Sequence, residues 1–277
     1  MRWQPAELTA ARSETPSART LTLRVPGWPG HLPGQHVDVR LTAPDGYHAE
    51  RSYSLAAPAD GDHIELTIQR VPDGEVSGYL VDYFPVGARI EIRGPVGGWF
   101  VWHPETGGAA VLIAGGSGIV PLAAILRARR KAPSANPFRL IYALRDPEDL
   151  YYRNELLPPD HELSAVGGAP TASAIERLAP AAEIPLSREP VASAEFVMPG
   201  DDVEVFLAFS RSAPPAARPP GRLTAEEIAK HSLTPAPDVT CYVCGPTPFV
   251  EFAASALVSA GHDPALIRTE RFGPTGK

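Results

Sequence analysis

The pattern of apolar residues changes character near residue 109. Before that point, short runs alternate apolar and polar positions between glycines and prolines, as in strands with one face exposed. From residue 109 the run AAVLIA is continuously apolar, as in a strand buried on both faces, and leads through GGSGIVP into the helical pattern LAAILRARR. The sequence therefore predicts two domains of different class, residues 1–104 and 105–277.

The first domain is predicted to be an antiparallel β-barrel. Six short runs indicate strands, and one helix is expected around residues 77–84, after the turn PDGEVS. The runs are residues 20–25, 35–41, 51–56, 63–71, 88–94 and 98–102.

The second domain is predicted to be an α/β domain with an open parallel sheet, because buried strands alternate with helical patterns. A stretch rich in Ala, Pro and Ser, about residues 158–202, interrupts it and holds one possible short helix, ASAIERLA. It is longer than ordinary connections, so it is interpreted as an insertion, a surface appendage or mobile flap rather than a catalytic element.

Composition excludes several classes of protein. A net charge of −7 argues against general binding of nucleic acid, which needs clustered cations. The sequence shows neither the apolar core of a signal peptide nor an apolar run of about 20 residues, so we expect a cytoplasmic protein without membrane contact. Cys241 and Cys244 are the only cysteines, which excludes a disulfide framework and a four-thiolate iron–sulfur site within the chain, and no metal site is expected.

Two motifs suggest ligand binding, and each has a purely structural alternative. Gly115, Gly116 and Gly118 lie where a buried strand gives way to a helix, so bare backbone could approach a pyrophosphate at the helix N-terminus. Their spacing is not GxGxxG, and a tight turn would explain them equally well. In the segment RSYS, residues 51–54, a cation, an aromatic ring and hydroxyls could hold a phosphate and a flat ring, or could simply form a solvated sheet face.

Six motifs in register resolve these alternatives. RSYS, GEVSGYL, RGPVGGWF, GGSGIVP, CGPTPFVE and ERFG follow one another in this order. In order and approximate spacing the chain resembles the ferredoxin–NADP reductase family over nearly everything except the insertion. The resemblance implies a flavin-binding barrel followed by a domain that binds a nicotinamide nucleotide.

The resemblance implies a role for each matching barrel residue. Arg51 would contact the flavin phosphates, Tyr53 would lie along the isoalloxazine ring, and the Ser54 hydroxyl would sit near the reactive N5. A second phosphate loop favours FAD over FMN, because backbone N–H groups at a helix start suit a pyrophosphate. The other cofactor contacts expected in the barrel are Ser52, Thr67, Ile68, Gly74, Val76 and Ser77.

The second domain would hold the nicotinamide nucleotide. The resemblance assigns the turn residues Gly115, Gly116, Ser117 and Gly118 to nucleotide contacts, with Pro121 starting the next helix, and adds Cys244, Gly245 and Pro246. The Cys244 thiol would lie beside the nicotinamide as a positioning and polarity element. A redox pair or half a zinc site with Cys241 is disfavoured, because an odd separation of three along a strand sends the two side chains to opposite faces.

Residues near two strand ends would tune the site. Ser210 and Arg211 match positions that distinguish a 2′-phosphate from a hydroxyl, so NADPH is preferred over NADH; Arg222 could assist, and both arginines could also be merely solvated. Glu270 would orient the reacting rings, and Phe272 would cover the flavin. The few residues after it could form a mobile cover or a disordered tail.

The expected function is hydride transfer from NADPH to bound FAD, with Ser54, Cys244 and Glu270 as the catalytic residues. A separate iron–sulfur or haem protein such as ferredoxin is the expected electron acceptor. The basic residues Arg127, Arg129, Arg130 and Lys131 could dock an acidic partner or form a solvated helix face. Two other functions stay open: a reductase of diffusible flavin, and a non-catalytic electron-transfer or regulatory subunit.

Overall fold

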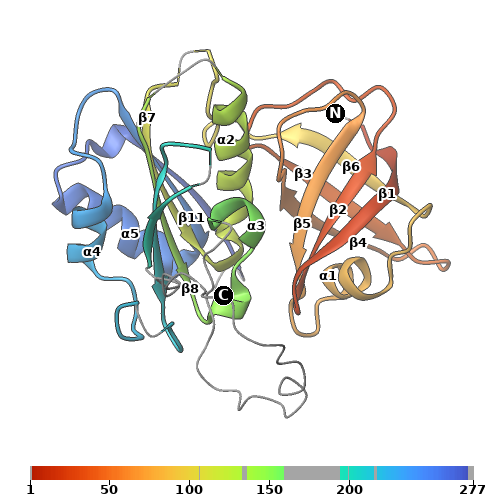
Figure 1. The fold of residues 1–277 in the computed structure, drawn as a ribbon. Helices are drawn as coiled ribbons and strands as arrows, with labels where there is room; N and C mark the ends of the chain where they lie inside the picture. Colours follow the sequence, from red (N-terminus) through yellow and green to blue (C-terminus); the bar gives the residue numbers. More distant parts are fainter. Residues whose placement is uncertain are drawn as a thin grey trace, which may run out of the picture.

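The fold is described from a computed structural model over residues 2–105, 107–132, 136–158, 194–198, 200–214 and 217–273. Two six-stranded sheets lie side by side, the first half of the chain forming one and the second half the other (Figure 1). No helix in this described part is long and apolar enough to cross a membrane.

The first sheet is an antiparallel barrel, as predicted. Its strand order is β4-β3-β6-β1-β2-β5, and a bridge between Leu55 and Leu66 brings its two outer strands together. Alternate side chains of the other five strands fill a core that includes Leu21, Val39 and Ile92, whereas β4 adds only partly buried side chains. The strands are β1 (Gln4–Thr15), β2 (Ala18–Arg24), β3 (His36–Thr42), β4 (His48–Ser54), β5 (His63–Gln69) and β6 (Arg89–Val96).

One predicted barrel strand is wrong. Residues 98–102 form no strand, because Phe100, Val101 and Trp102 are buried in succession, and Phe100 and Trp102 pack into the core of the second sheet. The sixth strand is instead β1, which the sequence did not predict: only Ala6 and Leu8 mark its buried face before a run of exposed positions.

The predicted barrel helix is present and begins slightly earlier. Helix α1 (Glu75–Gly78) continues into the π-helical turn η1 (Tyr79–Tyr83), so the helical segment follows the PDG turn directly. The guanidinium of Arg19 donates to the carbonyls of Leu80 and Phe84 and closes the end of this segment.

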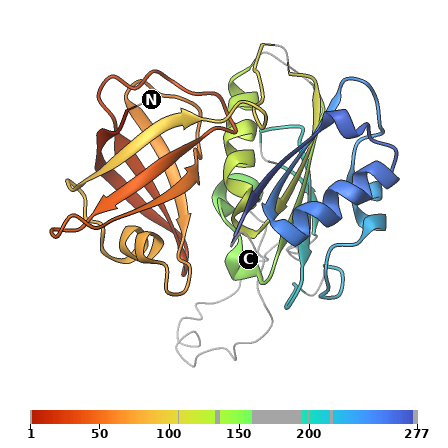
Figure 2. The same ribbon diagram turned by 180° about the vertical axis from the view of Figure 1, so that it is seen from behind.

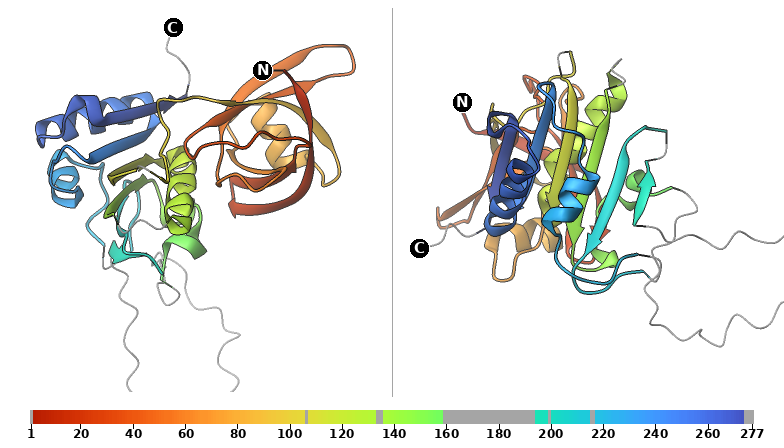
Figure 3. Two further views of the ribbon diagram at one scale, coloured as in Figure 1. Left: turned by 90° about the horizontal axis from the view of Figure 1, so that it is seen from above. Right: turned by 90° about the vertical axis from the view of Figure 1, so that its left-hand side faces the viewer.

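The second sheet is parallel apart from one edge strand, which largely confirms the predicted α/β domain. Its order is β12-β11-β7-β8-β10-β9, and only the short β9 pairs antiparallel. Helices α2 and α3 cover the face toward the barrel, whereas α4 and α5 cover the opposite face (Figures 1, 2 and 3).

The elements of this half alternate between strands and short or medium helices. The strands are β7 (Ala109–Gly115), β8 (Phe138–Leu144), β9 (Glu195–Val197), β10 (Glu204–Phe209), β11 (Val239–Pro246) and β12 (Ile267–Phe272). The helices are α2 (Ile119–Lys131), α3 (Arg153–Leu156), α4 (Ala225–His231) and α5 (Thr247–Ser259), with 3-10 turns η2 (Gly116–Gly118), η3 (Pro147–Asp149) and η4 (Pro264–Leu266).

The predicted insertion is described only at its ends. Its expected helix ASAIERLA lies outside the described residues, while β9 lies within the predicted insertion and extends the sheet at the β10 edge. The domain boundary at residue 104 stays a prediction.

Candidate active site

The predicted catalytic residues meet where the barrel faces the second sheet. Ser54 ends β4, and Cys244 lies near the end of β11, directly beside Glu270 on β12 in the parallel register. The carboxyl ends of parallel strands share one edge of a sheet, so the glycine turn after β7 lies at this same edge.

One hydrogen bond joins the two halves at this point. The Ser54 hydroxyl donates to Oε1 of Glu270 over 3.4 Å. The other carboxylate oxygen, Oε2, is buried and has no hydrogen-bond partner among the described residues. Burial raises the pKa of Glu270 to about 7, and the bond from Ser54 opposes that shift only in part. Glu270 can therefore carry a proton near neutral pH.

The Cys244 thiol is buried beside Glu270. Burial raises its pKa well above the ordinary value, the negative charge of Glu270 adds to the shift, and the N–H of Gly245 opposes it. Cys241 has other surroundings, with its sulfur 3.4 Å from Nδ1 of His262. Both cysteines are free thiols in this structure.

Close packing explains most of the glycines around this edge. A Cβ on Gly118 would lie 2.1 Å from the carbonyl oxygen of Cys244, and one on Gly115 or Gly245 would enter the ring of Phe249. Gly116 differs, since its φ is +55° and a Cβ there would meet open space. Three of the four glycines thus let two turns pack together, and only Gly116 leaves its side open to a ligand.

The helix after the glycine turn begins earlier than predicted. Helix α2 starts at Ile119, so Pro121 lies within its first turn and does not begin it. The first turn tolerates a proline, because its N–H groups have no intrahelical acceptor. Ser117 lies in the 3-10 turn just before the helix and is half-buried.

The RSYS residues line the barrel strand that leads to this site. The Arg51 guanidinium is exposed and donates only to the carbonyl of Glu50, whereas Tyr53 is half-buried, which raises the pKa of its phenol to about 12. The Ser52 hydroxyl instead donates to Asp38 over 2.7 Å and so belongs to a network within the barrel.

The start of α1 lies next to this strand. Tyr47, just before β4, donates its hydroxyl to Glu75 over 3.1 Å. Val76 and Ser77 are buried, and the Ser77 hydroxyl accepts from the N–H of Val71. No side chain caps the helix at Gly74, so its first backbone N–H groups stay available as donors.

Two residues predicted to contact the cofactor, Thr67 and Ile68, have side chains that pack within the protein. The Thr67 hydroxyl is buried between the hydroxyls of Thr20 and Tyr152, and Ile68 lies in the barrel core. Both side chains are therefore engaged within the protein, and a cofactor contact at Thr67 or Ile68 stays a prediction. The alternation of β5 turns Ile68 inward, and Tyr152, just before α3, covers Thr67.

The predicted 2′-phosphate residues follow β10. The backbone N–H of Ser210 donates to Leu144, and that of Arg211 to Arg145, which fixes this turn. The side chains of Arg211 and Arg222 are exposed and make no ion pair within the described residues. Arg218 between them is instead neutralised by Glu227 at 2.6 Å.

The end of β12 is partly open. Phe272 is 36% exposed and pairs in register with Pro246, where α5 begins. The last residues, 274–277, lie outside the described part of the chain, so the cover predicted for them is not tested.

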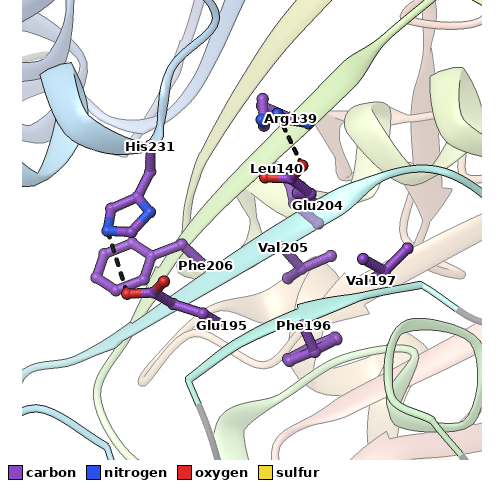
Figure 4. A pocket seen from close by; sticks show the side chains of 9 residues that line it. All are labelled: Arg139, Leu140, Glu195, Phe196, Val197, Glu204, Val205, Phe206 and His231. Carbon is purple, nitrogen blue, oxygen red and sulfur yellow. Dashed lines mark ion pairs between the residues drawn. The ribbon is translucent and has the colours of Figure 1, made fainter.

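A small cavity lies away from this site. It has a volume of about 200 Å³ at the β9 edge, opposite the β12 edge that carries Glu270 (Figure 4). His231 stacks on Phe206 with ring centroids 3.9 Å apart, and its Nε2 lies 3.6 Å from Glu195.

Comparison with known proteins shows what these two halves are. Residues 5–101 match the oxidoreductase FAD-binding domain, and residues 112–163 match the oxidoreductase NAD-binding domain. The fold and site thus define a two-domain oxidoreductase with one domain for FAD and one for a nicotinamide nucleotide.

Several curated relatives are named as components of oxygenase systems. The chain is 37% identical over 125 residues to methane monooxygenase component C of Methylosinus trichosporium, covering 45% of this chain and 36% of that protein. It is 27% identical over 239 residues to the propane 2-monooxygenase reductase component of Mycolicibacterium smegmatis, covering 84% and 56%. The chain thus spans about half or less of the length of these relatives.

Solved structures share the fold. A ferredoxin NADP+ reductase from Neisseria gonorrhoeae with bound FAD and NADP superposes with a TM-score of 0.69 at 18% identity, covering 98% of this chain and 99% of that one. The ferredoxin reductase in carbazole 1,9a-dioxygenase gives 0.71 at 24% identity, covering 98% and 70%. The chain belongs to the ferredoxin–NADP reductase-like family of oxidoreductases.

Proposed function

We propose that this chain is an FAD-dependent NAD(P)H oxidoreductase that acts as the reductase component of an electron-transfer system. The observation that carries the proposal is the meeting of Ser54, from the FAD-binding domain, with Glu270 and Cys244, from the nucleotide-binding domain. Each domain contributes chemistry-bearing side chains to one point, as a reaction between two bound cofactors requires.

The residues present fit FAD on the barrel. The exposed guanidinium of Arg51 and the uncapped start of α1 at Gly74 can hold its phosphates, and Tyr53 can lie against its ring. The buried, unpartnered Oε2 of Glu270 indicates a missing hydrogen-bond donor beside Ser54. When bound, the flavin supplies the hydride-accepting ring and the reduced nicotinamide supplies the hydride.

The residues of the second domain would orient and shield the nicotinamide nucleotide. Gly116 leaves the turn open at the start of α2, where backbone N–H groups favour a pyrophosphate. Cys244 presents a neutral thiol at the edge of the site, since its raised pKa keeps it protonated. Glu270 can hold or release a proton there near neutral pH, because its pKa is about 7.

We propose that NADPH is preferred over NADH. Arg211 and Arg222 are the basis, because their exposed guanidinium groups have no carboxylate partner in the described part of the chain. A guanidinium without a partner can pair with a 2′-phosphate through two parallel hydrogen bonds, and Ser210 can add a hydroxyl.

We propose a separate electron-acceptor protein, an iron–sulfur protein such as ferredoxin or a haem protein. Within these 277 residues two cysteines cannot supply the four thiolates of an iron–sulfur centre, so any such centre lies outside them. The relatives named as reductase components of propane 2-monooxygenase and naphthalene dioxygenase systems support the proposal as well.

Anaerobic reduction of the purified protein tests the function. We expect FAD to remain bound through gel filtration and its absorbance near 450 nm to be bleached by NADPH faster than by NADH. Loss of the flavin on the column would favour a reductase of diffusible flavin. Retained flavin that neither nucleotide bleaches would refute the proposal in favour of a non-catalytic subunit.

The nucleotide preference has its own test. Replacing Arg211 with Ala is expected to raise KM for NADPH about 10-fold or more and to leave KM for NADH unchanged, because a charge-assisted contact contributes about 1.5–3 kcal/mol. Arg139→Ala is the matched control, since this arginine is already paired with Glu204 at 2.8 Å. Equal effects of Arg211→Ala on the two nucleotides would contradict the proposed preference.

A further inference from the structure

A cluster of buried and partly buried polar groups joins the barrel to the second half of the chain. The members share hydrogen bonds across the boundary between the two sheets. We call it the interdomain cluster, and it consists of Arg127, Tyr152 and Glu155 from the second half with Glu14, Thr20, Ala56, Glu65 and Thr67 from the barrel.

Arg127 connects helix α2 to the barrel. Its Nη1 donates to the carbonyl of Ala56 over 2.7 Å and to Glu65 over 3.2 Å, while Nε and Nη2 donate to Glu155 within its own half. The side chain is 14% exposed, and its guanidinium lies 4.7 Å from the ring centroid of Tyr152. One side chain therefore satisfies groups on both sides of the boundary.

Tyr152 makes the second connection. Its hydroxyl donates to Thr67 over 2.6 Å, and Thr67 in turn is 2.7 Å from the hydroxyl of Thr20. Its backbone N–H donates to Glu14 over 3.1 Å, at a left-handed φ of +55°. A tyrosine keeps this unfavourable backbone conformation only where the surrounding contacts fix it. Here its carbonyl accepts from Glu155 and Leu156 in its own half, and its N–H and hydroxyl bind across the boundary.

The cluster is connected to both sides of the candidate active site. Ala56 lies two residues beyond Ser54, so its carbonyl belongs to the strand end that carries the hydroxyl. Arg127 lies nine residues beyond Gly118, about 13 Å along a helix that starts at the glycine turn. The only direct polar link between predicted catalytic residues, from Ser54 to Glu270, is a long 3.4 Å hydrogen bond and cannot by itself hold two domains in place.

We propose that Arg127 and Tyr152 are positioning residues that set the distance between the flavin side and the nicotinamide side of the site. This inference rests on the proposed function. Neither residue reaches the site itself. Arg127 acts through α2 and the carbonyl of Ala56 just after β4, whereas Tyr152 acts through Thr67 on β5 and Glu14 on β1. Hydride transfer needs the reacting atoms about 3–3.5 Å apart, and a displacement of about 1 Å can cost up to 100-fold in rate.

The other basic residues of α2 provide a contrast. Arg129 binds Asp201, and Arg130 binds Asp201 and the carbonyl of Glu155, all within the second half of the chain. Arg127 and Arg129 are therefore neither free to dock an acidic partner nor part of a solvated face, whereas Arg130 stays exposed beside its two partners. Arg130 is a matched control, because it shares the helix and the Glu155 neighbour of Arg127 but does not reach the barrel.

The test compares Arg127→Met, Tyr152→Phe and Arg130→Met with the parent holoprotein. Three quantities are measured: bound FAD per chain, the Kd for NADP+ from the binding difference spectrum, and the limiting rate of flavin reduction at saturating NADPH. We expect Arg127→Met to lower the limiting rate about 10-fold or more, with FAD content and Kd within twofold of the parent. Tyr152→Phe should give a smaller loss of the same kind, and Arg130→Met none.

A double variant separates positioning from loss of a side chain. Because Tyr152 acts through Thr67, adding Thr67→Val to Tyr152→Phe should lower the limiting rate no further. Limiting rates within twofold of the parent in both Arg127→Met and Tyr152→Phe would overturn the inference, as would losses that fall on Kd or FAD content. If Arg127→Met does not fold, Tyr152→Phe and the double variant decide. Failure of the proposed function would look different, since the parent itself would not be reduced.

Discussion

Glu270 gives a prediction whose size follows from its surroundings. Its pKa is about 7 in the folded protein against 4.5 for an ordinary glutamate, because burial penalises the charged form. Between these two values the folded state binds more protons than the unfolded state, so stability falls as the pH rises. With about 1.4 kcal/mol for each factor of ten in proton affinity, ionised Glu270 destabilises the flavin-free fold by about 3 kcal/mol above pH 7.

Glu270→Gln removes this penalty. The variant cannot ionise, so its free energy of unfolding relative to the parent should increase by about 2–3 kcal/mol between pH 5 and pH 8. The parent is the protein that loses stability across this window. Urea denaturation of the flavin-free proteins at pH 5, 6, 7 and 8, followed by tryptophan fluorescence, measures the difference at each pH.

The control is another glutamate near the same strand. Glu251 is 60% exposed and pairs with Arg271 at 2.8 Å, so Glu251→Gln reports the loss of a surface carboxylate as such. The compared quantity is the free energy of unfolding of Glu270→Gln minus that of the parent. If this difference stays constant from pH 5 to pH 8, or grows toward low pH, the account of Glu270 as a buried acid is refuted.

Two further predictions concern the edge beside Glu270. Gly118→Ala places a methyl group 2.1 Å from the Cys244 carbonyl, so it should destabilise the fold by about 2 kcal/mol or more and abolish NADP+ binding. The control Gly78→Ala lies in a helix with open space around it and should be neutral or stabilising by about 0.5–1 kcal/mol. Urea denaturation and difference spectroscopy compare the two variants, and equal stabilities would show that the turns do not pack as described. The thiols of Cys241 and Cys244 are both buried and have raised pKa values. Both should therefore resist iodoacetamide at pH 8 in the native protein and react with it in urea, as mass spectrometry can measure. Rapid labelling of either thiol in the native protein would contradict this placement.

The sequence predicts the elements whose burial pattern is regular. Strand β7 is buried at every position, and the alternation of β5 shows directly in its residues, so both were predicted close to their observed bounds. Strand β1 has only two apolar positions on its inner face before five exposed residues, which leaves too weak an alternation to recognise. The run at residues 98–102 misleads for the opposite reason, because three successive apolar residues fill the space beside the second core.

In the site, too, local patterns in the sequence reveal some features and miss others. Ser54 and Glu270 lie 216 residues apart, and only the order of the motifs suggested that they meet. Thr67 was expected to contact the cofactor, yet its hydroxyl is bonded to Tyr152, a residue that no motif singled out. A contact between two domains depends on how their surfaces meet, and neither local spacing nor periodicity carries that information.

Glycine in a binding motif carries two kinds of information that sequence alone does not separate. Gly115 and Gly118 look like a surface for a pyrophosphate, but their missing side chains admit Phe249 and the Cys244 backbone. This packing ties the turn after β7 to the end of β11, and so to Glu270 on the neighbouring strand. Replacing either glycine would therefore move Cys244 and its neighbours as well as change the turn. The motif fixes where the site is assembled, and Gly116 alone leaves the turn open to a ligand.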